Sequence, residues 1–243
     1  MGPIEKLLNM IYPPKCVFCG ELLNINSAVH ICGGCREKLP FTGSNVFRTS
    51  QESGARCWCD GAVSVFRYDG IVKEALKRYK FHDRPGYYKT FARLMAGRLA
   101  EPGGVRSYDL VMGVPLHRKR EYERGYNQAY LLSKALSVEL GLPEGSKFMG
   151  RARQTRAQSL LDRQDRQDNI RDAFIVKAPE KIKGRSVLLV DDIMTTGSTL
   201  EECGRMLKLA GAVKVTAAVV ATGRDYHGEE RNYRAGTGNY SWR

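Results

Sequence analysis

The residues best suited to chemistry in this chain lie in the run Val-Leu-Leu-Val-Asp-Asp-Ile-Met-Thr-Thr-Gly-Ser-Thr, from Val187 to Thr199. Its four leading apolar residues predict a strand that is buried on both faces, as strands of parallel sheets are. Two carboxylates, Asp191 and Asp192, follow that strand, and a turn of small and hydroxylated residues then opens onto a helical pattern. Ligands of open α/β sheets bind beyond the carboxyl ends of the strands, so we expect a binding site at this point.

The turn has the character of a phosphate site. Helix N-termini present unpaired N–H groups and a partial positive charge, and a glycine lets the backbone approach an anion closely. The residues that we expect to bind a phosphate are Thr195, Thr196, Gly197, Ser198 and Thr199. A Walker A loop, the other phosphate motif found at such a turn, is absent from the sequence.

The two aspartates indicate what else the ligand carries. Asp191 and Asp192 would repel the phosphate in the turn, so we assign them to the catalytic site, where they hold ribose hydroxyls and, directly or through water, Mg²⁺. Phosphoribosyl pyrophosphate (PRPP) combines a 5-phosphate, a ribose diol and a pyrophosphate that binds Mg²⁺, and it fits both halves of the run. The alternative is a strand, turn and helix with a fortuitous acidic pair, as in a receiver domain.

A second group of candidate ligand-binding residues follows the predicted strand at residues 108–115. Cations that come after a parallel strand reach the same edge of the sheet and suit a pyrophosphate. The residues that we assign to pyrophosphate binding are Pro115, Leu116, His117 and Arg118. His117 stands among basic residues, which favours a neighbour of the cations over a general base.

Residues 151–169 are polar, rich in Arg and Gln, and almost free of core residues. Two interpretations are open. The segment is either a solvated helix and loop, or a mobile lid that lays cations over a bound pyrophosphate and excludes water. Its position between two predicted strands of a phosphate-binding domain favours the lid.

Six of the seven cysteines lie in the first quarter of the chain. The candidate metal ligands are Cys16, Cys19, Cys32 and Cys35, two C-x2-C pairs separated by twelve residues. Four thiolates close a tetrahedral shell, so we expect a structural Zn²⁺ that stabilises a stretch too short to fold by itself. Reduced or disulfide-bonded cysteines and an Fe–S cluster are the alternatives. The C-x-C pair Cys57 and Cys59 has a poorer chelate spacing, and we expect no metal role for it.

The chain has 243 residues and a formal net charge of +13, which favours polyanionic ligands such as phosphorylated substrates or nucleic acid. Clustered cysteines without a secretion signal indicate a reducing compartment, and we expect a cytoplasmic protein. No apolar run approaches the ~18 residues of a membrane span. We expect an N-terminal helix, metal module and linker in residues 1–60, the main domain in 61–223 and a C-terminal tail in 224–243.

Periodicity and turn signals predict the elements of the main domain. Strand patterns cover residues 62–68, 108–115, 173–176, 187–190 and 213–221, and helical patterns cover residues 71–81, 87–99, 124–140 and 200–210. Helices that alternate with strands predict an α/β domain with a parallel sheet. The first two helices are rich in Lys and Arg, and a solvated face and a polyanion-binding face are equally supported for them.

In order and spacing these motifs resemble the ComF (ComFC, GntX) family, which is type I phosphoribosyltransferase-like and carries an N-terminal zinc module. Residues 187–199 are similar to the PRPP-binding motif, and residues 114–118 with 124–129 resemble the family's pyrophosphate loop. The residues that resemble its flexible loop are Arg151, Arg153, Thr155 and Gln158, followed by Arg166 and Asn169. The chain departs from the family in having no complete second pair of C-x2-C knuckles beyond the first two, and in residues 82–86, where the family usually has an earlier glycine.

The resemblance implies a type I phosphoribosyltransferase-like parallel sheet flanked by helices, with a small N-terminal zinc-finger module built on four cysteines. It also implies a cytoplasmic role in DNA uptake during natural transformation, with single-stranded DNA and a helicase-like competence protein as partners. Two functions stay open: transfer of phosphoribosyl from PRPP to an unidentified acceptor, and a non-catalytic adaptor that handles single-stranded DNA and uses the fold as a PRPP sensor or scaffold. No nucleobase pocket is recognisable in the sequence.

Overall fold

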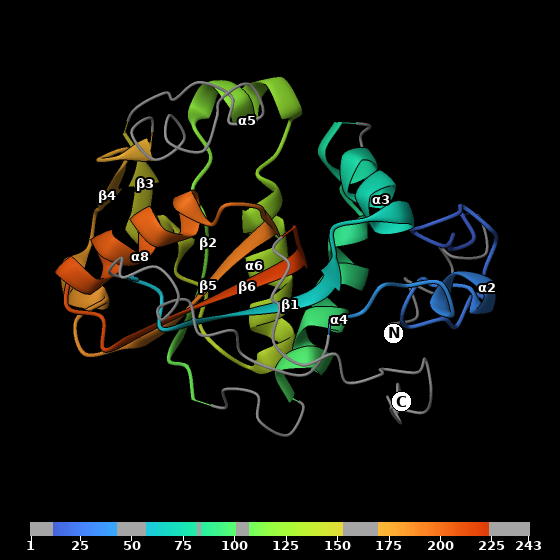
Figure 1. Cartoon of the computed structure of the whole chain (residues 1–243), viewed down its shortest axis with the longest axis horizontal. Helices are drawn as coiled ribbons and strands as arrows, with labels where there is room; N and C mark the ends of the chain where they lie inside the picture. The colour runs from blue at the N-terminus through green and yellow to red at the C-terminus, as the bar shows by residue number, and fades with distance from the viewer. Residues whose placement is uncertain (1–11, 43–56, 82–83, 101–106, 153–169, 224–243) are drawn as a thin grey trace.

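The computed structural model describes residues 12–42, 57–81, 84–100, 107–152 and 170–223. Its centre is a four-stranded sheet in the order β1-β6-β5-β2 (Figure 1). The strands are β1 (Gly61–Arg67), β2 (Leu110–Gly113), β5 (Ser186–Met194) and β6 (Lys214–Thr222). All of their pairings are parallel, which confirms the predicted class of sheet.

Helices cover both faces of the sheet (Figure 1). The helices on one face are α3 (Gly70–Phe81), α4 (Tyr87–Ala100) and α6 (Gln128–Leu140), and α8 (Ser198–Leu209) covers the other. Leu188 and Val190 of β5 join the core under the first group, whereas Val187 and Leu189 join the core under α8. Successive strand residues point to opposite faces, so the apolar run of β5 supplies both cores.

Loop segments line both edges of the sheet. Along β1, the N–H of Thr42 donates to the carbonyl of Val65 at 3.0 Å, and the N–H of Arg67 donates to the carbonyl of Pro40 at 2.8 Å. Residues 40–42, which the sequence placed in a linker, therefore extend this edge. Along β2, the segment 143–145 exchanges backbone bonds of 3.0 and 2.8 Å with Val111.

The helix predicted for residues 124–140 corresponds to α6 and the last residue of a second helix that precedes it. α5 (Arg118–Arg124) ends at Gly125, whose φ of 77° is left-handed, and α6 begins after the cap Asn127. α5 buries none of its residues, so apolar periodicity carried no signal for it. α6 ends at Gly141, whose φ of 65° is the left-handed conformation common at helix C-termini.

A two-stranded antiparallel ribbon stands beside α8 (Figure 1). β3 (Met149–Arg151) pairs with β4 (Phe174–Val176). The strand predicted at residues 173–176 thus belongs to this ribbon and not to the main sheet. Short 3₁₀ turns, η1 (Ser146–Phe148) and η3 (Pro179–Lys181), flank the two strands. Residues 153–169, most of the predicted lid, lie outside the described residues, as do the predicted N-terminal helix and tail.

The cysteine-rich module packs directly on the main domain. Besides short loops it contains α2 (Gly33–Arg36). Val17 and Phe18 are buried in the same core as α3 and α4, and the Phe18 ring lies edge-on to Phe66 and Phe91 with centroids 5.9 and 6.4 Å away. None of the described helices has the length and apolarity to cross a membrane.

Several cations of α3 and α4 bind backbone carbonyls. The buried Arg98 donates to the carbonyl of Thr42 at 2.9 Å. Arg93 donates to the carbonyl of Ala28 and, at 3.1 Å, to the carboxylate of Glu139. These residues stabilise the packing of the helices, so the basic residues of α3 and α4 do not form one common solvated face.

Candidate functional site

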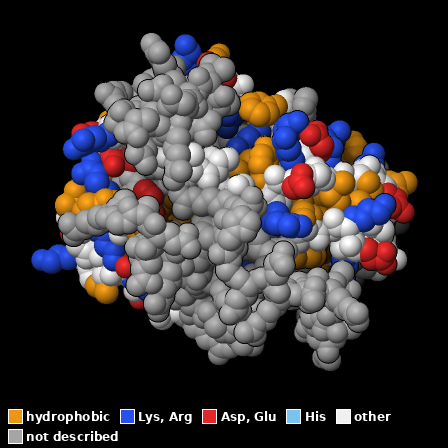
Figure 2. All heavy atoms as spheres, viewed as in Figure 1, with side chains coloured by type: hydrophobic (Ala, Val, Ile, Leu, Met, Phe, Trp, Pro, Cys, Tyr) orange, Lys and Arg blue, Asp and Glu red, His pale blue; other side chains and the backbone are white. Residues whose placement is uncertain are grey.

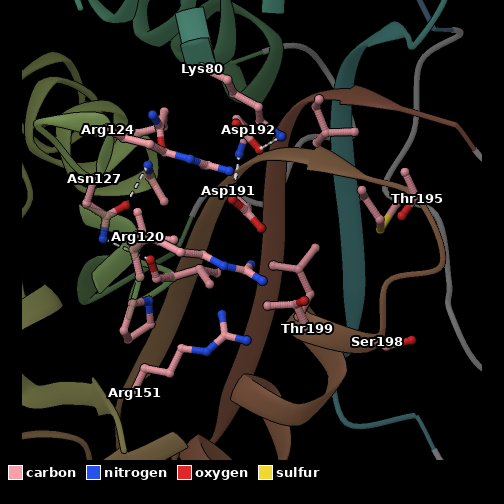
Figure 3. A pocket seen from close by; sticks show the side chains of 18 of the residues that line it. Lys80, Arg120, Arg124, Asn127, Arg151, Asp191, Asp192, Thr195, Ser198 and Thr199 are labelled. Carbon is pink, nitrogen blue, oxygen red and sulfur yellow. Dashed lines mark hydrogen bonds and ion pairs between the residues drawn. The ribbon is translucent and has the colours of Figure 1, made fainter. Parts of the chain in front are cut away.

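A cavity of about 650 Å³ opens at the carboxyl ends of β2 and β5, where the sequence predicted a site (Figure 3). Carboxylates of β5, the hydroxylated turn before α8, and basic residues from three other elements contribute to its wall. The residues that line it include Tyr68, Lys80, Phe81, Pro115, Leu116, Arg120, Arg124, Asn127, Gln128, Arg151, Asp191, Asp192, Thr195, Thr196, Gly197, Ser198 and Thr199. The site therefore gathers opposite charges around one space.

The two aspartates lie on β5 beyond the end of β2, because Gly113, the last residue of β2, pairs with Val190. The N–H of Asp192 donates to Oδ1 of Asp191 at 2.8 Å. Asp192 is 5 % exposed, and its Oδ1 lies 3.1 Å from Nζ of Lys80 on α3 (Figure 3). Successive side chains of a strand point to opposite faces, so Asp192 lies on the side of α3 and Asp191 on the side of α8.

The electrostatics of the pair favour a cationic or hydroxylated ligand. Burial and, after it, the charge of Asp192 raise the pKa of Asp191 to about 7, although Lys80 and Arg151 act in the opposite direction. Two adjacent carboxylates in a partly buried site cannot both ionise without cost. A ligand that brings hydroxyl donors or a divalent cation would relieve this repulsion.

The turn at residues 195–199 lines the cavity at the start of α8. Gly197 is the N-cap and adopts φ of 76°, a left-handed conformation that a glycine accepts without strain. The hydroxyls of Thr196 and Ser198 are 2.9 Å apart and hydrogen-bonded to each other. The first turn of α8 and the residues of this hydroxyl pair thus line the cavity, an arrangement suited to a phosphate.

Three arginines from two elements reach the same cavity (Figure 3). Arg124 of α5 stacks on Phe81 at 5.1 Å and donates to Oε1 of Gln128 at 3.2 Å. Arg151, at the end of β3, stacks on Phe174 at 5.1 Å. Burial lowers the pKa of both Arg120 and Arg151, and the charge of Arg120 lowers that of Arg151 further. Guanidinium groups remain charged under such shifts, so together they make a site for a strongly anionic group.

The backbone of β2 and the start of α6 fix the loop between them. A Cβ on Gly113 would lie 2.6 Å from the carbonyl oxygen of Ala129, so only glycine allows this contact. Asn127 caps α6 by accepting the N–H of Ala129 at 3.0 Å, and its Nδ2 donates to the carbonyl of Val114 at 3.2 Å. Pro115 and Leu116 follow directly and line the cavity.

The four predicted metal ligands come together in the N-terminal module. The Sγ atoms of Cys16, Cys19, Cys32 and Cys35 all lie within 4.8 Å of one another. Burial raises the pKa of the Cys16 thiol, but N–H groups of Cys32, Cys19 and Phe18 outweigh it and bring that pKa down to about 7. Four converging thiols with backbone N–H donors fit a tetrahedral structural Zn²⁺.

The remaining cysteine pair contacts α8. Sγ of Cys59 donates to the carbonyl of Leu200 at 3.3 Å, and the N–H groups of Trp58 and Cys59 donate to Oε2 of Glu201 at 2.6 and 3.3 Å. The segment therefore fastens β1 to the first turn of α8, next to the hydroxylated turn.

Two family models match the chain: the phosphoribosyl transferase domain over residues 81–238 and the double zinc ribbon domain over residues 7–46. Competence protein F of Haemophilus influenzae is 32 % identical over 219 residues, which span 83 % of this chain and 93 % of that protein. The chain belongs to the ComF family. Competence protein ComFC of Streptococcus pneumoniae is 30 % identical over 230 residues, 83 % of this chain and 96 % of that protein. DNA utilization protein YhgH of Escherichia coli K12 is 31 % identical over 156 residues, 63 % of this chain and 68 % of that protein.

Of the site residues expected from the sequence, this ComF chain brings the acidic pair, residues 195–199, Pro115, Leu116 and Arg151 to one cavity. His117 and Arg118 are absent from the described residues that line it. Nδ1 of His117 instead accepts the N–H of Lys119 at 3.3 Å and caps α5, and Arg118 is exposed. Arg153, Thr155 and Gln158 lie outside the described residues.

Arg120, Arg124 and Lys80 are the cavity residues of this ComF chain that residue chemistry alone did not single out. Arg120 and Arg124 are four positions apart on α5, so they share one side of a helix. This spacing is visible in the sequence, but it had no meaning before residues 118–124 were known to be helical. Lys80 reaches the site because the end of α3 lies beside Asp192 of β5, and sequence periodicity does not report this proximity.

Proposed function

We propose that the cavity binds PRPP with Mg²⁺ and that the protein acts in DNA uptake as a PRPP-binding phosphoribosyltransferase. The observation that carries this proposal is the convergence of an acidic pair, a hydroxylated helix N-terminus and three arginines on one space of about 650 Å³. No single phosphate or single cation would use all three groups. A sugar with a phosphate at one end and a pyrophosphate at the other would use each of them.

In this proposal each part of the ligand contacts a different group of cavity residues. The turn at residues 195–199 binds the 5-phosphate, and Asp191 and Asp192 accept hydrogen bonds from the ribose hydroxyls. Arg120, Arg124 and Arg151 hold the pyrophosphate beside Pro115 and Leu116. Mg²⁺ bound to the pyrophosphate supplies charge that offsets the leaving group.

Transfer would follow from this arrangement by positioning and charge stabilisation. The bond between ribose C1 and the pyrophosphate oxygen breaks, and its electron pair leaves with the pyrophosphate. A bond from an acceptor nitrogen to C1 forms, and the nitrogen loses its proton to water. The carboxylates stabilise the positive charge that develops on the ribose, and the arginines stabilise the departing pyrophosphate. The aromatic residues Tyr68 and Phe81 at the cavity wall give an acceptor a surface to pack on.

Calorimetric titration with PRPP and Mg²⁺ tests binding. We expect micromolar to millimolar affinity in the wild type and a loss of about 100-fold or more in the double variant Asp191→Asn, Asp192→Asn, because two charged hydrogen bonds that contribute about 1.5–3 kcal/mol each are lost. Wild-type protein that gives no heat over a range of temperatures would refute the proposal. Release of pyrophosphate, measured across a panel of bases, amines and DNA, then separates an enzyme from a PRPP sensor.

A second candidate function is favoured by the net charge of +13 and by the names of the relatives, which refer to competence and to DNA utilization. In it the protein is a non-catalytic adaptor in the cytoplasm that handles single-stranded DNA together with a helicase-like competence protein. Phosphate contacts make such binding fall steeply with salt. Anisotropy of a labelled oligonucleotide at 50 and 200 mM salt tests it, and binding that is absent at the lower salt counts against it.

A further inference from the structure

Three consecutive residues of α3 tie the cysteine module to the candidate PRPP site. Arg78, Tyr79 and Lys80 occupy the last helical turn before Phe81, where α3 ends. Each side chain leaves the helix in a different direction and binds a different part of the molecule. One short piece of helix therefore touches the metal module, the loop that begins α6, and the acidic pair.

The contact with the module is made by the guanidinium of Arg78. Its Nη2 donates to the carbonyls of Val17 at 3.2 Å and Phe18 at 2.7 Å. These two residues lie between Cys16 and Cys19, the first pair of predicted metal ligands. Phe18 is 4 % exposed, and its ring packs edge-on against Phe66 and Phe91. The backbone that positions the thiols of Cys16 and Cys19 is thus also the backbone to which Arg78 of α3 is hydrogen-bonded.

The contact with the ligand site is made by Lys80, whose Nζ lies 3.1 Å from Oδ1 of Asp192. Between the two cations, the hydroxyl of Tyr79 donates to the carbonyl of Gln128 at 2.9 Å, and the hydroxyl of Tyr126 donates to the carbonyl of Tyr79. Tyr79 is fully buried. These bonds fix the turn against α6, so Arg78 and Lys80 cannot move independently of each other.

We propose that metal bound by the four cysteines strengthens PRPP binding through this turn of α3, with Arg78 as the positioning residue. Thiolate coordination orders the backbone at residues 16–19. Arg78 transmits that order to the turn, and the turn holds Lys80 against Asp192, where it offsets the repulsion between the two carboxylates. The inference rests on the proposed function for the identity of the ligand. It assigns the cysteine module an effect on ligand affinity in addition to the stabilisation of its own fold.

Because coupling between two binding sites is reciprocal, zinc and PRPP must change each other's affinity by the same factor. The full chain is loaded with zinc, and zinc affinity is measured by competition with a chelator of known affinity, with and without saturating PRPP and Mg²⁺. We expect PRPP to raise zinc affinity by about fivefold or more, the lower end of typical coupling. The double variant Asp191→Asn, Asp192→Asn is the matched control for zinc chelation by PRPP itself, and it should show no such rise.

Variants of α3 test the route. With zinc present, the Arg78→Met variant should bind PRPP at least about fivefold more weakly than the wild type. Removal of zinc should then lower its PRPP affinity little further, since the hydrogen bonds between α3 and the module are already lost. Arg78→Lys should restore part of the affinity, because an ammonium can still reach one carbonyl. Lys73→Met removes the same charge from an exposed position on the same helix and should leave both affinities unchanged.

The outcomes separate the two proposals. Wild-type protein that binds no PRPP overturns the proposed function and this inference together. Wild-type protein that binds PRPP, but whose zinc affinity is the same with and without it, overturns the inference and leaves the function standing. This measurement needs no variant, so it decides the matter even if Arg78→Met lowers the melting temperature or fails to fold.

Discussion

The ammonium group of Lys80 lies 3.1 Å from the carboxylate of Asp192, although Lys80 belongs to the end of α3 and Asp192 to β5, more than 100 residues further along the chain. Lys80 also lines the cavity, so this ion pair is part of the candidate site and not only of the packing. A cation that neutralises one carboxylate of the pair leaves the other to accept ligand hydroxyls.

Substitution of Lys80 by Met should weaken binding of PRPP with Mg²⁺ by about tenfold, the effect of losing one charged contact of roughly 1.4 kcal/mol. The methionine keeps most of the aliphatic stem, so the loss reports on charge. Lys73→Met, on the solvent side of the same helix, is the control for net charge. Equal affinities of the two variants in a calorimetric titration would contradict the role of Lys80.

The pKa of Asp191 predicts two opposite dependences on pH. Because burial raises this pKa from its usual range to about 7, the folded state holds a proton that the unfolded state has lost above pH 4, and the contribution of Asp191 to stability is lost as pH rises through about 7. Ligand binding needs the carboxylate, so affinity for PRPP should rise over the same window. Chemical denaturation and titration at pH 5.5 and 8 check both trends, and Asp191→Asn should remove the first.

Arg120 and Arg118 offer a matched pair on one helix. Arg120 lines the cavity, whereas Arg118 is exposed and is not among the described lining residues. Arg120→Met should weaken PRPP binding by about 10- to 100-fold, since a charged hydrogen bond contributes about 1.5–3 kcal/mol. Arg118→Met should change it less than about twofold. If the order is reversed, the pyrophosphate lies where the sequence first placed it, at residues 115–118.

Gly113→Ala should destabilise the fold, because its Cβ would meet the carbonyl oxygen of Ala129 at 2.6 Å and both partners are backbone. We expect a loss of about 2–3 kcal/mol, or roughly 5–10 °C in melting temperature. Gly86→Ala is the control, since a Cβ there meets no atom within 4 Å. A Gly113→Ala variant that melts with the wild type would mean that β2 and α6 can separate without cost.

Zinc stoichiometry distinguishes the two groups of cysteines. Cys35→Ser should abolish bound zinc and lower the melting temperature, because Cys35, Val17 and Phe18 are buried in the core shared with α3 and α4. Cys57→Ser should keep its zinc, since Cys57 lies outside the cluster formed by the four predicted ligands. Elemental analysis of the purified variants measures both, and loss of zinc from Cys57→Ser would place that residue in the metal site.

The sequence predicted the parts of this molecule whose physics is local. The apolar runs at residues 187–190 and 213–221 specify strands buried on both faces, and the C-x2-C spacing specifies the thiol cluster. Asp191, Asp192 and the following turn were found because strand, acids and helix start are consecutive in the chain. Each of these inferences needs only a few neighbouring residues.

The rest of the site depends on contacts between distant residues, and there the sequence was insufficient. α5 is a surface helix without a buried face, so no periodicity identified it, and the residues predicted to bind pyrophosphate, 115–118, do not include Arg120 and Arg124, which line the cavity. The apolar pattern at 173–176 predicts a strand but does not specify which strand it pairs with, and in the structure it pairs with β3. The cations of α3 and α4 looked alike in the sequence, yet Arg78 binds the metal module and Lys80 binds Asp192.

Figure 2 shows cations and acids interspersed over the described surface on the face viewed in Figure 1, with no large area of one sign. The net charge of +13 is therefore a property of the whole chain more than of a single patch on this face. A polyanion would therefore meet no concentrated positive patch on this described face, whereas several cations do come together at the cavity.

The loops along β1 and β2 restrict how other molecules can join this protein. Within the described residues, segments 40–42 and 143–145 already occupy backbone groups on the two outer strands. A partner cannot readily lengthen the sheet by adding a strand of its own, and two copies cannot pair edge to edge without first displacing these segments. Binding of a protein partner or of a nucleic acid at these edges then depends on side chains and not on backbone pairing. Single substitutions can therefore change that binding one residue at a time.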